Sequence, residues 1–178
     1  MLIPLDGSAL AEQILAPALA LGTSTEATYT LLHVIERYRF VRGTAVPYTS
    51  RLDSPALVYE QAEAQDYLNG IALLMRAAGL HVQTLVAAAH DARTAIWRAA
   101  CQQDSDVIAM TTHGRGGLSP LLVGSVAMHV LRDSHLPVLL YRPQERAQGG
   151  QARATPAAAH HYRASRIQLS GRLVYPYA

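Results

Sequence analysis

Short apolar runs alternate with segments of helical periodicity along the first 143 residues, and this alternation constrains the fold more than any other feature. Runs such as "TYTLLHVI" and "DVIAMT" have the mostly apolar core of strands that are buried on both faces. Because parallel strands require crossover connections, which are usually helical, the order predicts one open five-stranded parallel sheet with helices on both faces (α/β class).

Glycine, proline and capping residues indicate where these elements begin and end. After "MLIPL" we expect a helix that Asp6 or Ser8 caps, that Pro17 loosens and that Gly22 ends. The polar, irregular residues 36–53 are expected to form a long loop. Further helices are expected in "PALVYEQAEAQDYLNGIALLMRAAG", in "DARTAIWRAACQQ", capped by Asp91 or Thr94, and in "SVAMHVLRD", and further strands in "LHVQTLVA" and "PVLLYRP".

The composition changes after residue 143, which divides the chain into a domain, residues 1–143, and a tail, residues 144–178. The domain holds ten Arg and twelve acidic residues, a net charge of −2, whereas the tail holds five Arg and one acidic residue, a net charge of +4. The tail is rich in Ala, Arg, Gln and Gly without a sustained period, so we expect it to be mostly disordered. The domain shows no basic face of the kind that binds nucleic acid, and we do not expect such a partner.

Lysine is absent, and all fifteen basic residues are Arg. This excludes a Walker-type phosphate loop and Schiff-base chemistry on lysine. The single cysteine, Cys101, excludes an internal disulfide framework, and we interpret it as an inert, partly buried thiol. No apolar run reaches the roughly 18 residues of a membrane helix, and no secretory signal pattern is present. A cytoplasmic protein without a membrane partner is expected, and the histidine spacing predicts no structural metal.

Two groups of glycines stand ten residues apart in "MTTHGRGGLSPLLVGSVAMHVL". The first group directly follows the strand-like run "DVIAM", and the second, Gly124, opens a helix-like run with Ser125. Glycines at the end of a strand let backbone N–H groups approach an anion, and a helix N-terminus adds further N–H groups. The pattern is typical of a phosphate site without lysine; the alternative is that the glycines only form a turn and Ser125 only caps the helix.

At these residues the chain resembles the universal stress protein family. The stretch "VIAMTTHGRGGLSPLLVGSVAMHVLRDSHLPVLLYRP" is similar to the C-terminal signature of the family, and "IPLDGSALAEQILAPALALG" and "YTLLHVIE" are similar to its first strand–helix pair and second strand. The resemblance covers residues 1–143 and implies the adenine nucleotide hydrolase-like, Rossmann-like variant of the fold. Family members usually have several more residues before the first strand than "MLIPL" supplies, which is compatible with a misplaced start.

The resemblance implies the residues that would contact the base and ribose of a bound ATP. Pro4 and Asp6 would flank the nucleotide at the end of the first strand, although Asp6 can equally be read as a helix cap. Val34 would meet the adenine through backbone hydrogen bonds. Met110 and Thr111 would lie under the ribose. The ATP-binding branch of the family carries Gly where this chain has Thr111, so this side chain departs from the pattern.

The phosphate-binding pattern of that branch is Gly, two residues, Gly, nine residues, Gly, then Ser or Thr. Gly114, Gly124 and Ser125 match its last three positions. The resemblance implies that these residues and Val126 wrap the phosphates, with Mg²⁺ carried on the phosphates themselves. Arg115 could reach a terminal phosphate, and the alternative is an exposed, solvated side chain.

The resemblance therefore implies a regulatory ATP-binding protein, a stress-response switch or adaptor with an unknown protein partner. No positioned catalytic base is visible, so slow ATP hydrolysis is the most we expect. A dimeric scaffold that binds no nucleotide is the alternative, and Thr111 favours it. An adenylate-forming or adenylate-cleaving enzyme ranks last, because "PLDGSA" replaces the Ser-Gly-Gly-x-Asp-Ser loop of that class. The apolar last strand, Val138–Tyr141, predicts a homodimer, since family members pair this strand across a two-fold axis.

Overall fold

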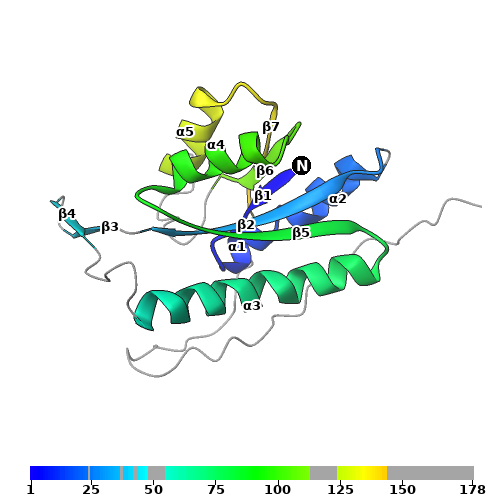
Figure 1. Ribbon diagram of the computed structural model, residues 1–178. Helices are drawn as coiled ribbons and strands as arrows, with labels where there is room; N and C mark the ends of the chain where they lie inside the picture. The colour runs from blue at the N-terminus through cyan, green and yellow to red at the C-terminus, as the bar shows by residue number, and fades with distance from the viewer. Residues whose placement is uncertain (24, 37, 42–43, 48–54, 113–123, 144–178) are drawn as a thin grey trace, which may run out of the picture. The chain divides into compact units, whose positions relative to one another are not determined.

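Five strands form one parallel sheet in the spatial order β5-β2-β1-β6-β7 (Figure 1). Each neighbouring pair in this sheet runs parallel. The expectation of an open five-stranded parallel sheet is therefore confirmed. The strands are β1 (Leu2–Pro4), β2 (Thr28–Glu36), β5 (His81–Ala89), β6 (Ile108–Thr111) and β7 (Val138–Tyr141).

The computed structural model describes residues 1–143 except 24, 37, 42–43, 48–54 and 113–123. All described residues belong to the compact unit Met1–Arg146. The tail predicted for residues 144–178 lies outside the described residues.

The order of the strands switches direction at β1. From β1 the chain passes to β2 and then to the edge strand β5, and it later returns to the other side of β1 through β6 and β7. The crossovers that leave β1 and that lead into β6 therefore lie on opposite faces of the sheet. In open α/β sheets, ligands bind beyond the carboxyl ends of the strands at such a switch point.

Helices cover both faces of the sheet (Figure 1). The helix α3 packs on β2 and β5, and α1 lies on the same side, whereas α4 and α5 pack against each other on the opposite face. The helices are α1 (Ala9–Glu12), α2 (Leu15–Gly22), α3 (Pro55–Ala77), α4 (Ala92–Gln102) and α5 (Ser125–Asp133). No helix among the described residues is long and apolar enough to cross a membrane.

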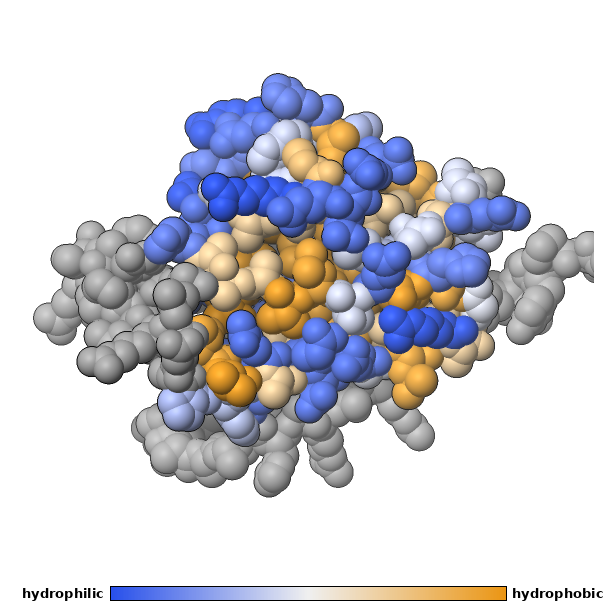
Figure 2. All heavy atoms as spheres, viewed as in Figure 1, coloured by the Kyte–Doolittle hydropathy of each residue, from blue (hydrophilic) through white to orange (hydrophobic). Residues whose placement is uncertain are grey.

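The larger described core cluster lies between the sheet and the α4–α5 layer. Strand residues of β1, β2 and β6 contribute Leu2, Leu32 and Ile108, each with no exposed surface. Strict alternation along β2 places the neighbours of Leu32 on the other face, where Ile35 packs with Leu57 and Ala64 of α3. Figure 2 shows apolar residues along the band where the edge strand β5 crosses between α4 and α3, with hydrophilic residues over both helices.

The first predicted helix is divided in two, which corrects the expectation of one continuous helix, although its predicted end at Gly22 is confirmed. The helix α1 ends at Glu12, and α2 begins at Leu15. Between them, the N–H groups of Gln13 and Ile14 bond three residues back instead of four. Pro17 explains the break, because it has no N–H to bond the carbonyl of Gln13.

The long loop predicted for residues 36–53 is also wrong in part. β2 continues to Glu36, and the next residues form β3 (Tyr38–Val41) and β4 (Thr44–Pro47), an antiparallel pair. The segments "YRFV" and "TAVP" are rich in β-branched and aromatic residues, which favour strands. The polar residues around them led to the prediction of a loop.

The remaining helices and strands lie where they were predicted, but Cys101 does not have the predicted environment. The buried face of α4 consists of Ala95, Ile96, Ala99 and Ala100. Cys101 follows on the other side of the helix, and its thiol is exposed. The prediction of a partly buried thiol was therefore wrong.

Candidate functional site

A cavity of about 450 Å³ opens at the carboxyl ends of β1, β2 and β6. Its volume is in the range of small-molecule sites, and it lies at the switch point of the sheet. The N-terminal turns of α4 and α5 complete its walls. Its lining comprises Pro4, Leu5, Asp6, Ala11, Leu32, His33, Val34, Glu36, Ala92, Ile96, Met110, Thr111, Thr112, Gly124, Ser125, Val126 and Ala127.

At the end of β1 the chain turns sharply past Asp6. Gly7 has φ +79°, a conformation that L side chains rarely adopt, so the turn favours glycine here. The Oδ1 atom of Asp6 accepts hydrogen bonds from the N–H of Ser8 at 2.9 Å and from its hydroxyl at 2.6 Å. The Ser8 oxygen in turn accepts from the N–H of Ala11 at 3.1 Å. Ser8 is thus the cap of α1, and Asp6 holds Ser8 in place while its own carboxylate lines the cavity.

The backbone of Val34 faces the open end of β1. The N–H of Leu5 donates to the carbonyl of Leu32 at 2.8 Å, and the N–H of Thr30 donates to the carbonyl of Met1 at 2.9 Å. The even-numbered residues of β2 therefore direct their backbone groups toward β1. β1 ends at Pro4, which pairs with Leu32, so the strand stops before it could pair with Val34. The N–H and C=O of Val34 thus point toward the cavity, as a donor and an acceptor side by side.

The opposite end of the cavity is formed by the start of α5. Gly124 is the N-cap, with φ −56° and ψ 151°, and its carbonyl accepts the first helical bond from Met128 at 2.9 Å. The N–H groups of Ser125, Val126 and Ala127 precede the first helical donor and point out of the helix end, where the positive end of the helix dipole lies. The N–H of Gly124 itself donates to the carbonyl of Thr112 at 2.6 Å.

One expectation about this helix end is corrected, and one stays a prediction. Gly124 was expected to wrap the phosphates; its N–H has a partner on Thr112, and its contact with a phosphate stays a prediction. Ser125 was read as a possible cap, but it is the first residue of α5, and Gly124 occupies the cap position. The donors that remain directed at the cavity from α5 are those of the next three residues.

The structure brings most of the predicted site residues together. Pro4, Asp6, Val34, Met110, Thr111, Gly124, Ser125 and Val126 all line the one cavity. They come from β1, β2, β6 and α5, which are distant in sequence. Gly114 and Arg115 lie outside the described residues, so their predicted roles stay predictions.

Sequence reasoning missed the part of the wall that Glu36 of β2 and the start of α4 contribute. Glu36 follows Val34 by two residues, so it lies on the same face of β2, and its Oε1 accepts from the N–H of Ala92 at 2.9 Å. Asp91 caps the same helix by accepting a hydrogen bond from the N–H of Thr94. This hydrogen bond lowers the pKa of the Asp91 carboxyl. The period of the strand could have identified Glu36, but its contact with α4, 56 residues away, could not be read from the sequence.

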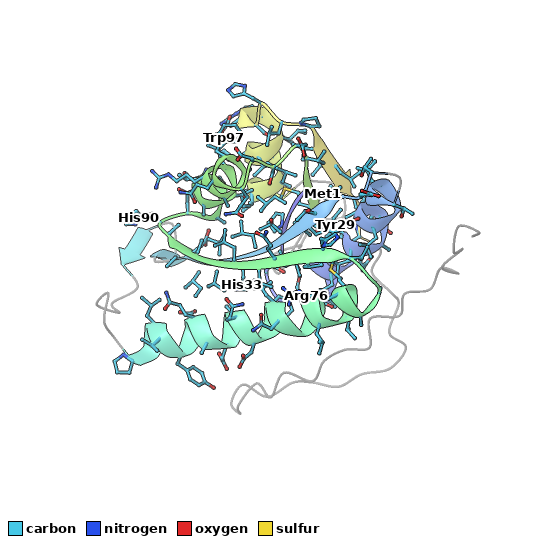
Figure 3. The ribbon with its side chains drawn as sticks, turned by 45° about the vertical axis from the view of Figure 1, so that its right-hand side comes forward. Met1, Tyr29, His33, Arg76, His90 and Trp97 are labelled. Atoms are coloured by element: carbon cyan, nitrogen blue, oxygen red, sulfur yellow. The ribbon has the colours of Figure 1, made fainter. Side chains whose placement is uncertain are left out.

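On the other face of β2, His33 points toward α3 (Figure 3). Its ring meets that of Tyr67 edge to face, with the centroids 5.9 Å apart. His33 is also one of the residues that line the cavity, although its ring lies on the α3 side of the sheet. Within the described parts of the chain, no three His, Cys, Asp or Glu side chains gather as metal ligands.

Comparison with known proteins gives one consistent result. A sequence model of the Universal stress protein family matches residues 1–142. Universal stress protein MJ0531 of Methanocaldococcus jannaschii is 27% identical over 142 residues, which are 80% of this chain and 81% of that protein.

Two solved structures are similar in fold. The hypothetical protein MJ0577 is 25% identical, with 82% of this chain and 96% of that one covered and a TM-score of 0.63. A universal stress protein solved in complex with cAMP is 17% identical, with 80% and 95% covered and a TM-score of 0.52. At that identity the second likeness concerns the fold alone.

Proposed function

The chain belongs to the universal stress protein family, and from that premise we propose that it binds ATP, with Mg²⁺ on the phosphates, at the carboxyl edge of the sheet. Binding would act as a regulatory signal that biases the interaction of the protein with a protein partner. One observation carries the proposal: a single cavity holds an outward-facing backbone donor and acceptor on β2 and the N-terminal N–H groups of α5.

The two ends of this cavity suit the two ends of a nucleotide. Adenine presents a ring nitrogen that accepts and an adjacent amino group that donates, and Val34 offers the matching pair. The apolar side chains of Ile96 and Met110 line the space beside it. Phosphates carry negative charge, which the N-terminus of a helix attracts by about 0.3–1 kcal/mol when exposed and up to ~2 kcal/mol when partly buried. The carboxylate of Asp6, beside the end of β1, is a suitable acceptor for ribose hydroxyls.

The direct test is calorimetric titration of the full chain with ATP, with and without Mg²⁺, and with adenosine. We expect ATP to bind more tightly than adenosine, because only ATP reaches the N–H groups of α5. Mass spectrometry of ligand released from gently purified protein provides an independent reading. If neither ATP nor adenosine binds at millimolar concentration, the proposal is wrong.

A scaffold that binds no nucleotide is the second candidate, and two observations favour it. Thr111 is only 6% exposed and lines the cavity where the ATP-binding pattern carries glycine. The N–H of Gly124 is bound to the carbonyl of Thr112, which removes one donor from the phosphate end. A protein that is folded and dimeric but does not bind ATP would support this candidate.

We also propose that the chain forms a homodimer through β7. β7 lies at the edge of the sheet. Met128 and Leu131 of the preceding helix are 47% and 46% exposed. An uncovered edge strand beside apolar side chains is an aggregation hazard that pairing removes. Light scattering should therefore give about twice the chain mass of 19.2 kDa. A monomer at micromolar concentration would contradict the dimer but not nucleotide binding.

A further inference from the structure

The two ends of the cavity, at β2 and at α5, differ in the charges that they present to a ligand. One wall is formed by β2, and the other lies at the end of β6, where α5 begins. β2 and β6 flank β1, so the two strands are separated by two strand spacings, about 10 Å. The α5 wall carries the positive end of a helix dipole. The β2 wall carries the carboxylate of Glu36. The N-terminus of α4 also lies at the β2 wall, but the Glu36 carboxylate already bonds its Ala92 N–H. The helix end that remains for an anion is that of α5, which favours a nucleotide with its phosphates at α5 and its base at β2.

We propose that Glu36 is the residue that selects the base, by accepting a hydrogen bond from an exocyclic amino group at position 6 of a purine. This inference rests on the proposed nucleotide binding and adds to it a specificity-determining residue. The ligand class that follows is a 6-aminopurine nucleotide, in preference to a 6-oxopurine nucleotide of the same size and charge.

The direction of β2 places the amino group on the Glu36 side. Along a strand, the N–H of a residue precedes its C=O, so the C=O of Val34 lies nearer to Glu36 than its N–H does. A base whose ring nitrogen accepts from the Val34 N–H has its amino group at the Val34 C=O. An amino group has two hydrogens, and the second one points further along the strand. Glu36 is the next residue whose side chain lies on the same face as Val34.

The carboxylate of Glu36 is already held in position. Its Oε1 accepts from the N–H of Ala92 at 2.9 Å. A carboxylate has two oxygens and about four lone-pair sites, so this bond leaves acceptor capacity for a ligand. Because α4 fixes the side chain before the ligand arrives, little conformational freedom is lost on binding.

A 6-oxopurine reverses this pattern. Its carbonyl oxygen would face both the C=O of Val34 and the carboxylate of Glu36, so three acceptors would meet without a hydrogen. A site built around acceptors for an amino group rejects an analogue that lacks it, because the acceptors are left unpaired. Glu36 is exposed to solvent, so we expect discrimination at the lower end of the range for charged hydrogen bonds, about tenfold.

The test compares the affinities of ATP and ITP, in which a carbonyl oxygen replaces this amino group and the adjacent ring nitrogen carries a hydrogen. Calorimetry with the full chain should show ATP binding about tenfold or more tightly than ITP. In Glu36→Gln, the amide oxygen can still accept from Ala92 while the amide nitrogen offers a donor to the 6-oxo group. The preference should therefore shrink severalfold, with ATP weakened and ITP strengthened, while the mismatch between ITP and the Val34 backbone remains. Asp91→Ala, which removes the cap of the same helix at a residue outside the cavity, should keep the wild-type preference.

Each outcome is decisive. Equal affinity of the wild type for ATP and ITP overturns the role of Glu36 while nucleotide binding stands. An unchanged preference in Glu36→Gln, or a loss of preference in Asp91→Ala as large as in Glu36→Gln, overturns it as well. A loss of preference in Asp91→Ala would mean that the preference depends on the integrity of α4 and not on the carboxylate of Glu36. If the wild type binds neither nucleotide, the proposed function and this inference both fail.

Discussion

The backbone N–H of Gly124 donates to the carbonyl oxygen of Thr112 at 2.6 Å, which joins the end of β6 directly to the start of α5. Two residues that are 12 positions apart in the sequence thereby meet at one edge of the cavity. This bond occupies the N–H of Gly124. The role we assign to the glycine is therefore to leave space, where a side chain would otherwise lie, beside the N–H groups of the next three residues.

Gly124→Val should therefore abolish ATP binding without unfolding the protein. The backbone angles, φ −56° and ψ 151°, suit any residue, so the substitution introduces no backbone strain. The side chain would occupy the space of the phosphates, whereas adenosine has none and should bind within a few-fold of wild type. Calorimetry with both ligands measures this. Equal ATP affinity in wild type and variant would mean that Gly124 only shapes a turn.

Ser125→Ala is the matched control for the same helix end. Its loss of a hydroxyl should weaken ATP binding by about 1.5–3 kcal/mol if that group bonds a phosphate. Its melting temperature should stay close to wild type, because Gly124, not Ser125, is the N-cap.

A second prediction concerns stability at the end of α2, where Gly22 faces Tyr29. A Cβ on Gly22 would overlap the phenolic oxygen of Tyr29 and lie 2.8 Å from its ring carbon Cζ. Tyr29 is 1% exposed beside α2 (Figure 3), so its ring has little room to move. Gly22→Ala should therefore cost about 1–3 kcal/mol, the usual cost of overpacking. For a chain of this length that lowers the melting temperature by roughly 2–12 °C.

Gly70→Ala is the control with the opposite sign. Gly70 lies inside α3, and a Cβ there would meet nothing within 4 Å. Alanine in a helix interior is more stable than glycine by about 0.5–1 kcal/mol, so the melting temperature should rise. Adding Tyr29→Phe to Gly22→Ala should recover part of the loss. Calorimetric melting that shows equal effects at Gly22 and Gly70 would contradict this account of the packing.

The central sheet could be predicted because its strands are apolar runs such as "TLLHVI" between residues that cap or end helices. β3 and β4 could not, since Tyr38–Val41 and Thr44–Pro47 lie in a segment whose overall polarity is typical of a loop. About half of the residues that line the cavity were predicted from spaced glycines and from the family resemblance. The contribution of Glu36 depends on its contact with Ala92, which exists only once β2 and α4 are packed together.

A third prediction concerns the pH dependence of the α4 cap. The N–H of Thr94, which Asp91 accepts at 2.9 Å, lowers the pKa of Asp91 below its ordinary value of 3.8. When the pKa of a carboxyl is lower in the folded state than in the unfolded state, its ionised form stabilises the fold. This contribution is complete at pH values above the unfolded pKa and is lost as the pH falls through the folded-state pKa. Asp91→Ala should therefore cost about 1 kcal/mol at neutral pH, the usual value of an N-cap.

The measurement is urea unfolding of wild type and Asp91→Ala at neutral pH and in steps below pH 3.8. The difference in the free energy of unfolding should shrink toward zero as the acid is titrated, because wild type then loses the charged cap too. A difference that stays constant across this range would show that the charge of Asp91 does not contribute.

The last prediction decides between the two proposed functions. Thr111 pairs with Tyr141 of β7, is 6% exposed, and lines the cavity between the base end and the phosphate end. If its side chain crowds the ligand, Thr111→Gly should strengthen ATP binding by about fivefold or more, since relieving an overpacked contact is worth on the order of 1–3 kcal/mol. The same change should lower stability by about 1 kcal/mol, because glycine weakens a strand and leaves the buried contacts of Thr111 unmade.

Thr111→Ser provides the matched control, because it keeps the hydroxyl and removes only the methyl group. Titration of Thr111→Gly with adenosine shows where the side chain crowds the ligand. If the adenosine affinity is unchanged, the crowding is at the phosphates; if it rises together with the ATP affinity, the crowding is at the ribose. A wild type that does not bind ATP beside a Thr111→Gly variant that does would identify this residue as the reason the chain acts as a scaffold. An ATP affinity that is equal or lower in Thr111→Gly would show that the threonine is compatible with the nucleotide, and the departure from the family pattern would then carry no weight against ATP binding.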